Sequence, residues 1–576
     1  MSNMVAAKKE QVTFEIEKAL QQAKTKGQLD FREMPNFAVE IPREKAHGDF
    51  ATNAALLLSK ETKMPPRQIA QIILANLESS NNNSDSSSDS SSNSSAAGAD
   101  RFEKVEIAGP GFLNFYLGTG WLYKLVPQII AEDKNFGKSS FGQGEKVQIE
   151  FVSANPTGLL HMGNARGAAL GDTLCNLLKA AGYEVSKEFY INDAGNQIEN
   201  FGKSLEARYL QLLGENVDFP EEGYHGEDII ETVKKIMAEV GDAYLKVEAS
   251  LRREFLIQKA LQEKISNIKN DLARFGVEYD VWFSEQTLHD SGAITKTIQE
   301  LQEKGYIYEK EGALWLKTTQ FGDEKDEVMV RSNGLPTYFA ADIAYHQNKF
   351  ERGFQKVINI WGADHHGHVA RMKGAMRALG YDPEKLQVIL MQLVRLSQEG
   401  EIVRMSKRSG QYITLAELMD EVGRDAARFF FVMRSPDSHL EFDLDLAKEE
   451  SAENPVYYVQ YAHARICSIL KASPEKLTES GAADFTLLKE DAEIDLLRKL
   501  ADFPEEIIEA AVSYEPHRLT RYAHDLASLF HSFYNSCRVL TDEEELRKAR
   551  LLLVEATRIT LRNVLLLLGV STPERM

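Results

Sequence analysis

Short apolar runs alternate with amphipathic stretches through the middle of the chain. The run at 147–152 (VQIEFV) is typical of a buried parallel strand. After a turn that contains Pro and Gly, leucines recur at helical spacing over 170–178, and 185–191 (VSKEFYI) predicts a second strand. A strand, a helix and a second strand in this order predict a βαβ unit, which begins a doubly wound parallel sheet.

The N-terminal region has a mixed pattern that a polar segment interrupts. Residues 12–77 suggest helices and short strands, with an apolar helix over 69–77, and 105–115 predicts two strands joined by a Gly-Pro-Gly turn. Residues 79–100 between them are almost all Ser, Asn, Asp, Ala and Gly, and cannot bury enough surface to offset the entropy of ordering. We therefore expect an α+β domain over 1–118 with a disordered Ser-rich insert at 79–100.

The rest of the chain predicts a larger α/β domain followed by helices. A long charged helical pattern over 228–275 predicts a helical insertion, at about 205–300, between two halves of the sheet. Four later apolar runs predict further strands, at 313–316, 327–330, 357–361 and 388–391. We expect this Rossmann-like domain over 119–450, and an all-α bundle of four or five helices over 451–576. The predicted fold class is multidomain α/β.

Composition narrows the class of protein. A net charge of −20 over 576 residues argues against a protein that coats nucleic acid non-specifically, although local basic tracks are compatible with it. The three cysteines, Cys175, Cys467 and Cys537, are far apart and support neither a zinc site nor a disulfide framework. We find no signal peptide and no apolar run of about eighteen residues, so we expect a soluble cytoplasmic protein without a membrane partner.

Two distant segments carry candidate phosphate chemistry. His161 and Asn164 sit where a helix begins, and a helix N-terminus offers unpaired N–H groups and a partial positive charge to an anion. Far downstream, 404–408 (RMSKR) supplies positive charge. A lone histidine of this kind more often caps a helix or packs in a core, and a lone Met-Ser-Lys is usually a solvated loop. Together, in this order, they predict that ATP is opened between its α- and β-phosphates.

Over nearly its whole length the chain resembles the class I arginyl-tRNA synthetases. The matching segments are 47–53 (HGDFATN), 150–164, 191–197 (INDAGNQ), 338–342 (YFAAD), 361–366 (WGADHH), 454–464 (NPVYYVQYAHA) and 573–576 (PERM). The resemblance implies that the chain is an arginine–tRNA ligase: arginyl-adenylate forms with release of pyrophosphate, and the arginyl group then moves to the terminal ribose of tRNA. The implied substrates are L-arginine and ATP with Mg²⁺, the partner is tRNA(Arg), and a monomer is favoured.

The resemblance assigns the phosphate chemistry to both segments. His161 and Asn164 would hold the phosphates, and since the family usually has a second histidine at position 164, we expect His161 to matter more. Lys407 would neutralise the departing pyrophosphate, and Arg404 stands where the family motif has its first lysine. The implied ATP-binding residues are Asn155, Pro156, Gly158, His161, Gly163, Asn164, Gly362, Asp364, His365, Met405, Ser406 and Lys407.

The amino acid site follows from the chemistry of a guanidinium, which is planar, permanently charged and suited to a carboxylate. Tyr338 and Asp342 are four residues apart, so they share a face if the segment is helical. The resemblance implies that Asp342 reads the guanidinium by a salt bridge and Tyr338 by its hydroxyl or ring. Glu150 and Asn155 match positions that hold the α-amino and carboxylate groups, beside His161. A buried Glu150 needs a cation, which a protein arginine would supply equally well.

The C-terminal bundle resembles the anticodon-binding domain of the same family, and the N-terminal domain resembles the one that contacts the tRNA elbow. RNA bases are commonly held on aromatic and polar surfaces. Tyr457 and Tyr461 are therefore predicted tRNA contacts, and the resemblance implies that Met576 is another, because it matches a terminus that approaches the anticodon loop. Packing in a core is the alternative for either tyrosine.

Two other functions fit parts of the sequence. Asp364, His365, His366 and His368 follow a predicted strand and resemble the Asp-His-His motif of metal-dependent phosphoesterases. The earlier aspartate motifs of that family are missing from their expected arrangement, so we predict no metal site. A synthetase relative that binds tRNA without catalysis is the other alternative, and the presence of His161 and Lys407 argues against it.

Overall fold

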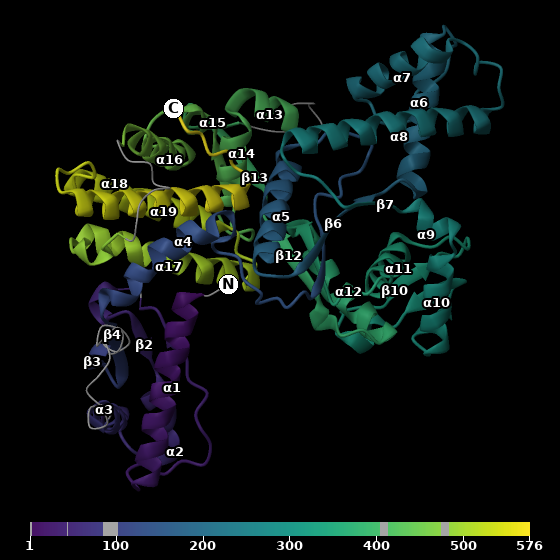
Figure 1. The fold of residues 1–576 in the computed structure, drawn as a ribbon. Helices are drawn as coiled ribbons and strands as arrows, with labels where there is room; N and C mark the ends of the chain where they lie inside the picture. Colours follow the sequence, from purple (N-terminus) through teal and green to yellow (C-terminus); the bar gives the residue numbers. More distant parts are fainter. Residues whose placement is uncertain (1–2, 43, 84–101, 404–412, 474–482) are drawn as a thin grey trace. The chain divides into compact units, whose positions relative to one another are not determined.

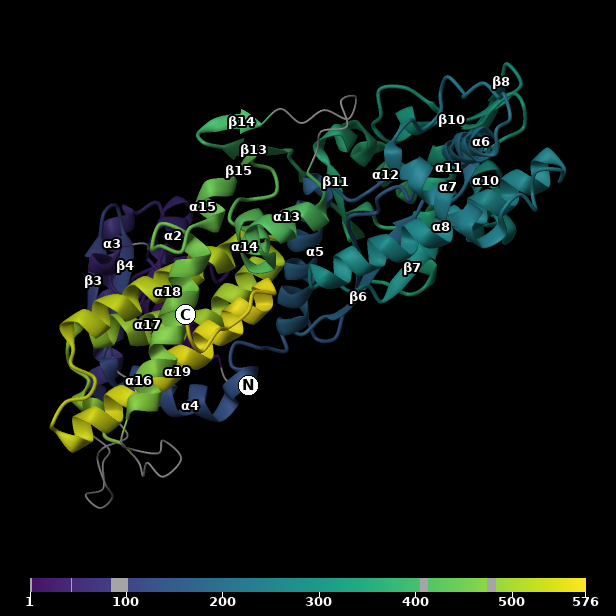
Figure 2. The ribbon, with the colours of Figure 1, turned by 90° about the horizontal axis from the view of Figure 1, so that it is seen from above.

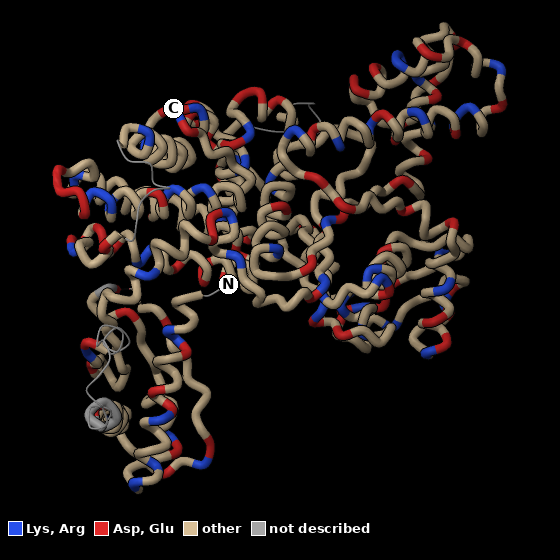
Figure 3. The backbone as a smooth tube through the Cα atoms, in the orientation of Figure 1, with Lys and Arg blue, Asp and Glu red and all other residues tan. Residues whose placement is uncertain are grey.

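The computed structural model describes residues 3–576 apart from 43, 84–101, 404–412 and 474–482 (Figure 1). The chain divides into two compact units. One comprises Met1–Gly137, Arg465–Glu506 and Asp525–Asn563, and the other comprises Lys138–Ala464, Ile507–His524 and Val564–Met576. Among the described residues no helix is both long enough and apolar enough to cross a membrane. Figure 3 shows Lys and Arg interspersed with Asp and Glu along the chain. Although the net charge is negative, basic residues therefore occur in many places.

The second unit is built on a five-stranded parallel sheet in the order β12-β11-β5-β6-β7. Its strands are β5 (Lys146–Glu150), β6 (Glu184–Ile191), β7 (Val281–Ser284), β11 (Lys356–Gly362) and β12 (Leu386–Met391), and all four pairings are parallel. The chain leaves β5 towards β6 and β7 and later returns on its other side as β11 and β12. This confirms the predicted doubly wound sheet and puts its switch point between β5 and β11.

Helices cover the sheet as the apolar periodicity requires. Helix α5 (Met162–Ala180) connects β5 to β6, and the leucines predicted to face the core are buried. A Cβ atom at Gly171 would lie 2.3 Å from the ring of Phe151, so glycine lets α5 approach the end of β5 closely. Helices α10 (Ala293–Glu303), α11 (Tyr338–Glu351) and α12 (His366–Leu379) share one apolar core with residues of the sheet.

A helical insertion follows β6. It consists of α6 (Gly195–Leu212), α7 (Glu227–Val240) and α8 (Ala249–Arg274), which are drawn in Figure 2. Their apolar residues form a core of their own. The predicted insertion ran to about residue 300, but β7 and the short helix α9 (Gln286–Asp290) lie within that range, and β7 pairs with β6 in the main sheet. The strand was missed because its four residues (VWFS) are too few to show a period.

Two small sheets complete this unit. Strands β8 (Ile307–Lys310), β9 (Ala313–Leu316) and β10 (Glu327–Val330) are antiparallel, which confirms two of the predicted strands. Strand β13 (Val394–Gln398) pairs with β14 (Glu401–Val403) and β15 (Leu440–Asp443). Three helices lie near this sheet in the sequence: α13 (Leu415–Val422), α14 (Arg424–Val432) and α15 (Leu444–Lys448).

The N-terminal part of the first unit has the predicted α+β composition. Its antiparallel sheet has the order β1-β2-β4-β3, with β1 (Val39–Glu40), β2 (Phe50–Thr52), β3 (Phe102–Ala108) and β4 (Phe112–Leu117). Helices α1 (Met4–Thr25), α2 (Ala54–Thr62) and α3 (Pro66–Asn83) pack with it. Residues 79–83, which we assigned to the Ser-rich insert, are the end of helix α3, and 84–100 lie outside the described residues.

The C-terminal region is helical, as its apolar periodicity predicts. Its α-helices among the described residues are α16 (Pro455–Ala472), α17 (Asp491–Val512), α18 (His517–Ser536) and α19 (Glu544–Leu568). The apolar runs that predicted them are buried, for example Leu551, Val554 and Leu565 in α19. A further helix, α4 (Leu125–Glu132), precedes the main sheet in the sequence.

Candidate active site

Polar side chains gather where the parallel strands end. Glu150 is the last residue of β5, Asp193 follows β6, Glu285 follows β7, and Asp364 follows β11. The carboxyl ends of parallel strands lie along one edge of a sheet, and ligands of such folds bind there, beside the switch point. The edge beside β5 is therefore the candidate site.

The turn after β5 is strained. Val152 and Ser153 have φ values of 71° and 38°, a region that β-branched residues rarely adopt. Hydrogen bonds hold the turn on both sides, because the Ser153 hydroxyl donates to Glu150 Oε1 (2.8 Å) and accepts from the Tyr190 backbone N–H (3.2 Å). Strain of this kind is retained where surrounding contacts fix it, which is typical of functional sites.

His161 is the N-cap of α5, and its side chain takes part in a reciprocal cap. Its Nδ1 accepts from the Gly163 backbone N–H (3.1 Å), while Asn164 Oδ1 accepts from the backbone N–H of His161 (3.1 Å). Because Nδ1 is an acceptor, the neutral ring carries its proton on Nε2, which is then a donor. The histidine thus caps the helix, and its capping bond fixes the tautomer that could donate to an anion.

The second segment predicted to bind phosphate, 404–408, is not among the residues that the structure describes. This segment contains Arg404, Met405, Ser406 and Lys407. The chain just after the gap is in place, because Thr414 forms a β-bridge with His161 and the Leu415 N–H donates to the Leu160 carbonyl (2.8 Å). Thr414 and Leu415, which follow this segment, therefore lie beside His161 and Leu160.

The other predicted nucleotide residues lie at the same edge. Asn155 is exposed, Pro156 is buried, and Gly158 and Gly163 are half-buried in the turn and first turn of α5. At the end of β11, a Cβ at Gly362 would lie 2.4 Å from Oδ1 of the exposed Asp364 side chain, so the two residues lie close together. The Asp364 and His365 side chains are 82% and 58% exposed and 3.8 Å apart. Within the described chain, no three His, Cys, Asp or Glu side chains are arranged to hold a metal ion.

A cluster of carboxylates lies beside Tyr338 and Asp342, which do share one helix, α11. Asp342 Oδ2 accepts from His368 Nε2 (3.2 Å), and Tyr338 lies over Gly195 at the start of α6. Glu285 is only 3% exposed. Burial raises the pKa of Glu285 to about 7, and the charges of Asp342 and Asp193 add to the rise. A bound cation would relieve the repulsion between these like charges.

Glu285 and Asp193 were missed as site residues by sequence reasoning. Asp193 lies within the segment 191–197, and its carboxylate accepts from the Ser284 hydroxyl (2.6 Å) and the Gln286 N–H (3.0 Å). Glu285 follows β7, the strand that the apolar pattern did not reveal. A carboxylate directly after a strand of the main sheet is the signal that would have found it.

The cation beside Glu150 is supplied by the protein. Lys349 Nζ lies 2.6 Å from Glu150 Oε2, and the lysine side chain is fully buried. We considered a protein arginine for this position, and the structure places a lysine there. An ammonium so buried depends on its carboxylate partner, so the pair behaves as one unit.

Tyr457 and Tyr461 lie one turn apart on α16. Their rings are stacked, with centroids 6.2 Å apart and planes 8° from parallel, and Tyr461 is 39% exposed. The end of the chain runs along the same helix, since Gln460 donates to the Ser571 carbonyl (3.1 Å) and His463 Nδ1 to that of Pro573 (2.9 Å). Met576 is exposed at its tip.

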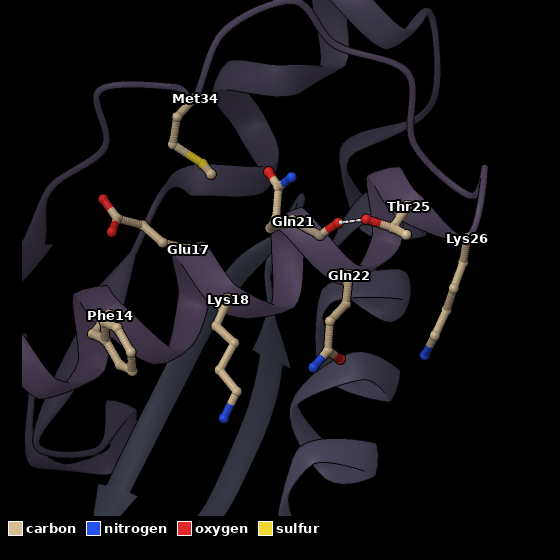
Figure 4. Close-up of a pocket in the computed structure, with 8 residues that line it drawn as sticks. All are labelled: Phe14, Glu17, Lys18, Gln21, Gln22, Thr25, Lys26 and Met34. Carbon is tan, nitrogen blue, oxygen red and sulfur yellow. Dashed lines mark hydrogen bonds between the residues drawn. The ribbon is translucent and has the colours of Figure 1, made fainter.

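Two hollows lie away from the strand ends. One, beside Tyr457, is lined by the chain around Arg424, Lys448 and Glu449. The other runs along α1 in the first unit (Figure 4), where Phe14, Gln21 and Met34 line it. None of the predicted site residues that the structure describes lines the groove along α1.

Comparisons with known proteins agree along the whole chain. Residues 10–89 match the arginyl tRNA synthetase N terminal domain, 125–443 match the tRNA synthetases class I (R) catalytic domain, and 459–576 match the DALR anticodon binding domain. Arginine–tRNA ligases of Heliobacterium modesticaldum and Moorella thermoacetica are 61% and 60% identical to it, with 100% of each chain covered. The arginyl-tRNA synthetase structure of Thermus thermophilus is 25% identical, covers 97% of this chain and 99% of its own, and has a TM-score of 0.72. The chain belongs to the arginyl-tRNA synthetase family of class I.

Proposed function

We propose that the chain joins L-arginine to tRNA(Arg) at the expense of ATP, which enters as its Mg²⁺ complex. In the first step an oxygen of the arginine carboxylate attacks the α-phosphorus, and the bond to the β-phosphate oxygen breaks to release pyrophosphate. In the second, a ribose hydroxyl of the tRNA 3′-terminal adenosine attacks the arginyl carbonyl, and AMP leaves. Catalysis of this kind rests on positioning and on neutralising charge.

The carboxylate pocket carries the proposal. Asp342 lies on α11 and Glu285 directly follows β7, and the charge of Asp342 adds to the rise that burial causes in the pKa of Glu285. A guanidinium stays protonated at any physiological pH and would relieve this repulsion. Tyr338, one turn before Asp342 on α11 and with its ring over Gly195, would supply a hydroxyl or an aromatic face.

The nucleotide side of the proposal rests on the start of α5. His161 Nε2–H and the helix N-terminus can donate to the phosphates, while the Asn164 carbonyl oxygen holds the cap. Asn155, Gly158, Gly362, Asp364 and His365 are proposed to line the rest of the nucleotide site. Lys407 and Arg404 are proposed, from the sequence alone, to neutralise the departing pyrophosphate.

Glu150 is proposed to take part in binding the α-amino group while it remains paired with Lys349. Tyr457, Tyr461 and Met576 are proposed to contact the anticodon loop, because aromatic rings suit unpaired bases and both Tyr461 and Met576 are exposed. We further propose that the protein acts as a cytoplasmic monomer, as the family resemblance suggests.

The test is aminoacylation with each amino acid in turn. Purified protein, ATP, Mg²⁺ and total tRNA should give acid-stable charging with arginine and with no other amino acid. Absence of arginyl-tRNA under these conditions would refute the proposed function. Activation should be measured with tRNA present, so that any dependence on tRNA does not mask it.

A further inference from the structure

A continuous chain of buried polar groups joins Glu150 to the helix turn that carries Asp342. Lys349 Nζ donates to Glu150 Oε2 (2.6 Å) and to Asn359 Oδ1 (2.9 Å). Asn359 Nδ2 donates to His346 Nε2 (2.6 Å), and His346 Nδ1 donates to the Asp342 backbone carbonyl (2.7 Å). We call Lys349, Asn359 and His346 the polar spacer.

In the polar spacer each hydrogen bond has only one possible donor and one possible acceptor, so the three side chains are held in a single arrangement. A lysine can only donate, so Asn359 must present its oxygen to Lys349 and its N–H₂ to His346. His346 must then accept on Nε2 and donate from Nδ1, which is the neutral form. Burial holds the pKa of His346 well below its usual value, and the charge of Lys349 lowers it further, so this form is kept. All three residues are at most 2% exposed.

The frame around the polar spacer is equally fixed. Asn359 of β11 is the direct neighbour of Glu150 on β5 in the parallel register, and Lys349 and His346 are on one helix, α11. Lys349 Nζ also lies 4.2 Å from the centre of the Tyr345 ring. The separation between Glu150 and Asp342 is thus set by two strands and a helix that are bonded to each other through side chains.

We propose that the polar spacer sets the length of amino acid that the site accepts, by fixing the position of Glu150 relative to Asp342. This inference rests on the proposed function, in which Glu150 serves the α-amino end of arginine and Asp342 the guanidinium. The two ends of arginine are separated by three methylene groups, and a site with both ends fixed excludes a chain with two or four. Lys349, Asn359 and His346 are then positioning residues that touch no substrate.

Asn359→Leu is the sharpest variant, because it removes both internal bonds of the polar spacer with a side chain of the same branching and number of non-hydrogen atoms, and leaves the Lys349–Glu150 ion pair. The readout is the ratio of kcat/KM for arginine to that for its homologues with one methylene fewer and one more. Pockets commonly discriminate about 10–200-fold for one methylene. We expect the ratio to fall about tenfold or more in Asn359→Leu, with the KM for ATP unchanged.

Tyr345→Phe is the matched control. It removes one buried hydrogen bond from the same helix, between the Tyr345 hydroxyl and Glu188 (2.7 Å), and keeps the ring beside Lys349. It should leave the discrimination ratio unchanged. If Asn359→Leu does not fold, His346→Phe carries the test, because it retains the ring that lies edge-on to Trp361 and removes two spacer bonds.

The proposal is overturned if either spacer variant folds and keeps the native discrimination ratio, or if the kcat/KM values for all three amino acids fall equally. A failure of the proposed function has a different signature. In that case the unaltered protein fails to charge arginine, or Asp342→Asn and Glu150→Gln leave its KM for arginine unchanged.

Discussion

Arg428 and Asp172 form an ion pair inside the core of the second unit, with side chains that are 0% and 4% exposed. The pair joins α14 to α5, the helix that begins at His161. Arg428 also donates to the carbonyls of Leu568 (2.9 Å) and Phe275 (3.2 Å). Although burial raises the pKa of Asp172, the charges of Arg428 and Lys187 hold it below the usual value.

Asp172→Asn should destabilise the protein by about 3–5 kcal/mol, because it leaves a buried guanidinium without its carboxylate. Thermal or denaturant unfolding measures the change. Glu231→Gln removes the partner of Lys234 in an exposed pair on α7 and should leave the unfolding transition nearly unchanged. Equal effects of the two substitutions would contradict the structural role of the buried pair.

Arginine binding should strengthen as pH rises through about 7, the value to which burial raises the pKa of Glu285. Below that pH the carboxyl binds a proton, and the guanidinium, which does not titrate, loses one anionic partner. If binding requires the ionised form, the Kd for arginine rises about tenfold for each pH unit below the pKa. Calorimetric titration between pH 5.5 and 8 measures this slope, and Glu285→Gln should bind weakly with the slope removed.

The raised pKa of Glu285 also affects the stability of the protein. Here the effect of rising pH is unfavourable, whereas its effect on arginine binding is favourable. Glu285 holds its proton more tightly in the folded protein than in the unfolded chain, whose carboxyl has the ordinary value of 4.5. The folded state therefore binds more protons between about pH 4.5 and 7, and the contribution of this group to stability declines as pH rises through that window. Bound arginine should offset the decline, which thermal unfolding with and without arginine can detect.

Asp342→Asn should raise the KM for arginine about 30–1000-fold, which corresponds to about 2–4 kcal/mol for removing one partner of a desolvated charge pair. The KM for ATP should change little, because Asp342 is proposed to bind the guanidinium and not the nucleotide. Glu384→Gln, which alters an exposed pair with Lys373 on the neighbouring helix, is the control. A KM for arginine that stays near the native value would remove Asp342 from the guanidinium site.

The sequence predicts this site unevenly, and the reason is physical. Strand β5 and helix α5 have clear periods, so the place of His161 followed directly from the residues around it. Strand β7 has four residues and no detectable period, so the sequence predicted neither this strand nor a role for Glu285, which follows it. The partner of Glu150 is 199 residues away along the chain, at Lys349, and only the pairing of β5 with β11 and the packing of α11 bring them together. Local patterns cannot show such a contact.

His161→Gln and Asn164→Ala should separate catalysis from helix capping. We expect His161→Gln to lower the rate of arginine-dependent pyrophosphate exchange, with tRNA present, about 10²–10³-fold, as the loss of one transition-state donor usually does. Asn164→Ala removes the acceptor for the His161 N–H, so it should cost about 1 kcal/mol of stability with a smaller loss of rate. A larger loss of rate in Asn164→Ala than in His161→Gln would reverse the proposed roles.

Tyr461→Ala should weaken tRNA binding and leave the amino acid site intact. Stacking of one base on an aromatic side chain is worth about 1–3 kcal/mol, so the Kd for tRNA should rise about 5–150-fold. Tyr461→Phe is the matched control, because it keeps the ring that is stacked on Tyr457 and removes only the hydroxyl. Filter binding with tRNA(Arg) measures the Kd, and arginine affinity without tRNA should be the same in all three proteins. If Tyr461→Ala binds tRNA as tightly as Tyr461→Phe, the ring packs within the protein and does not contact the anticodon loop.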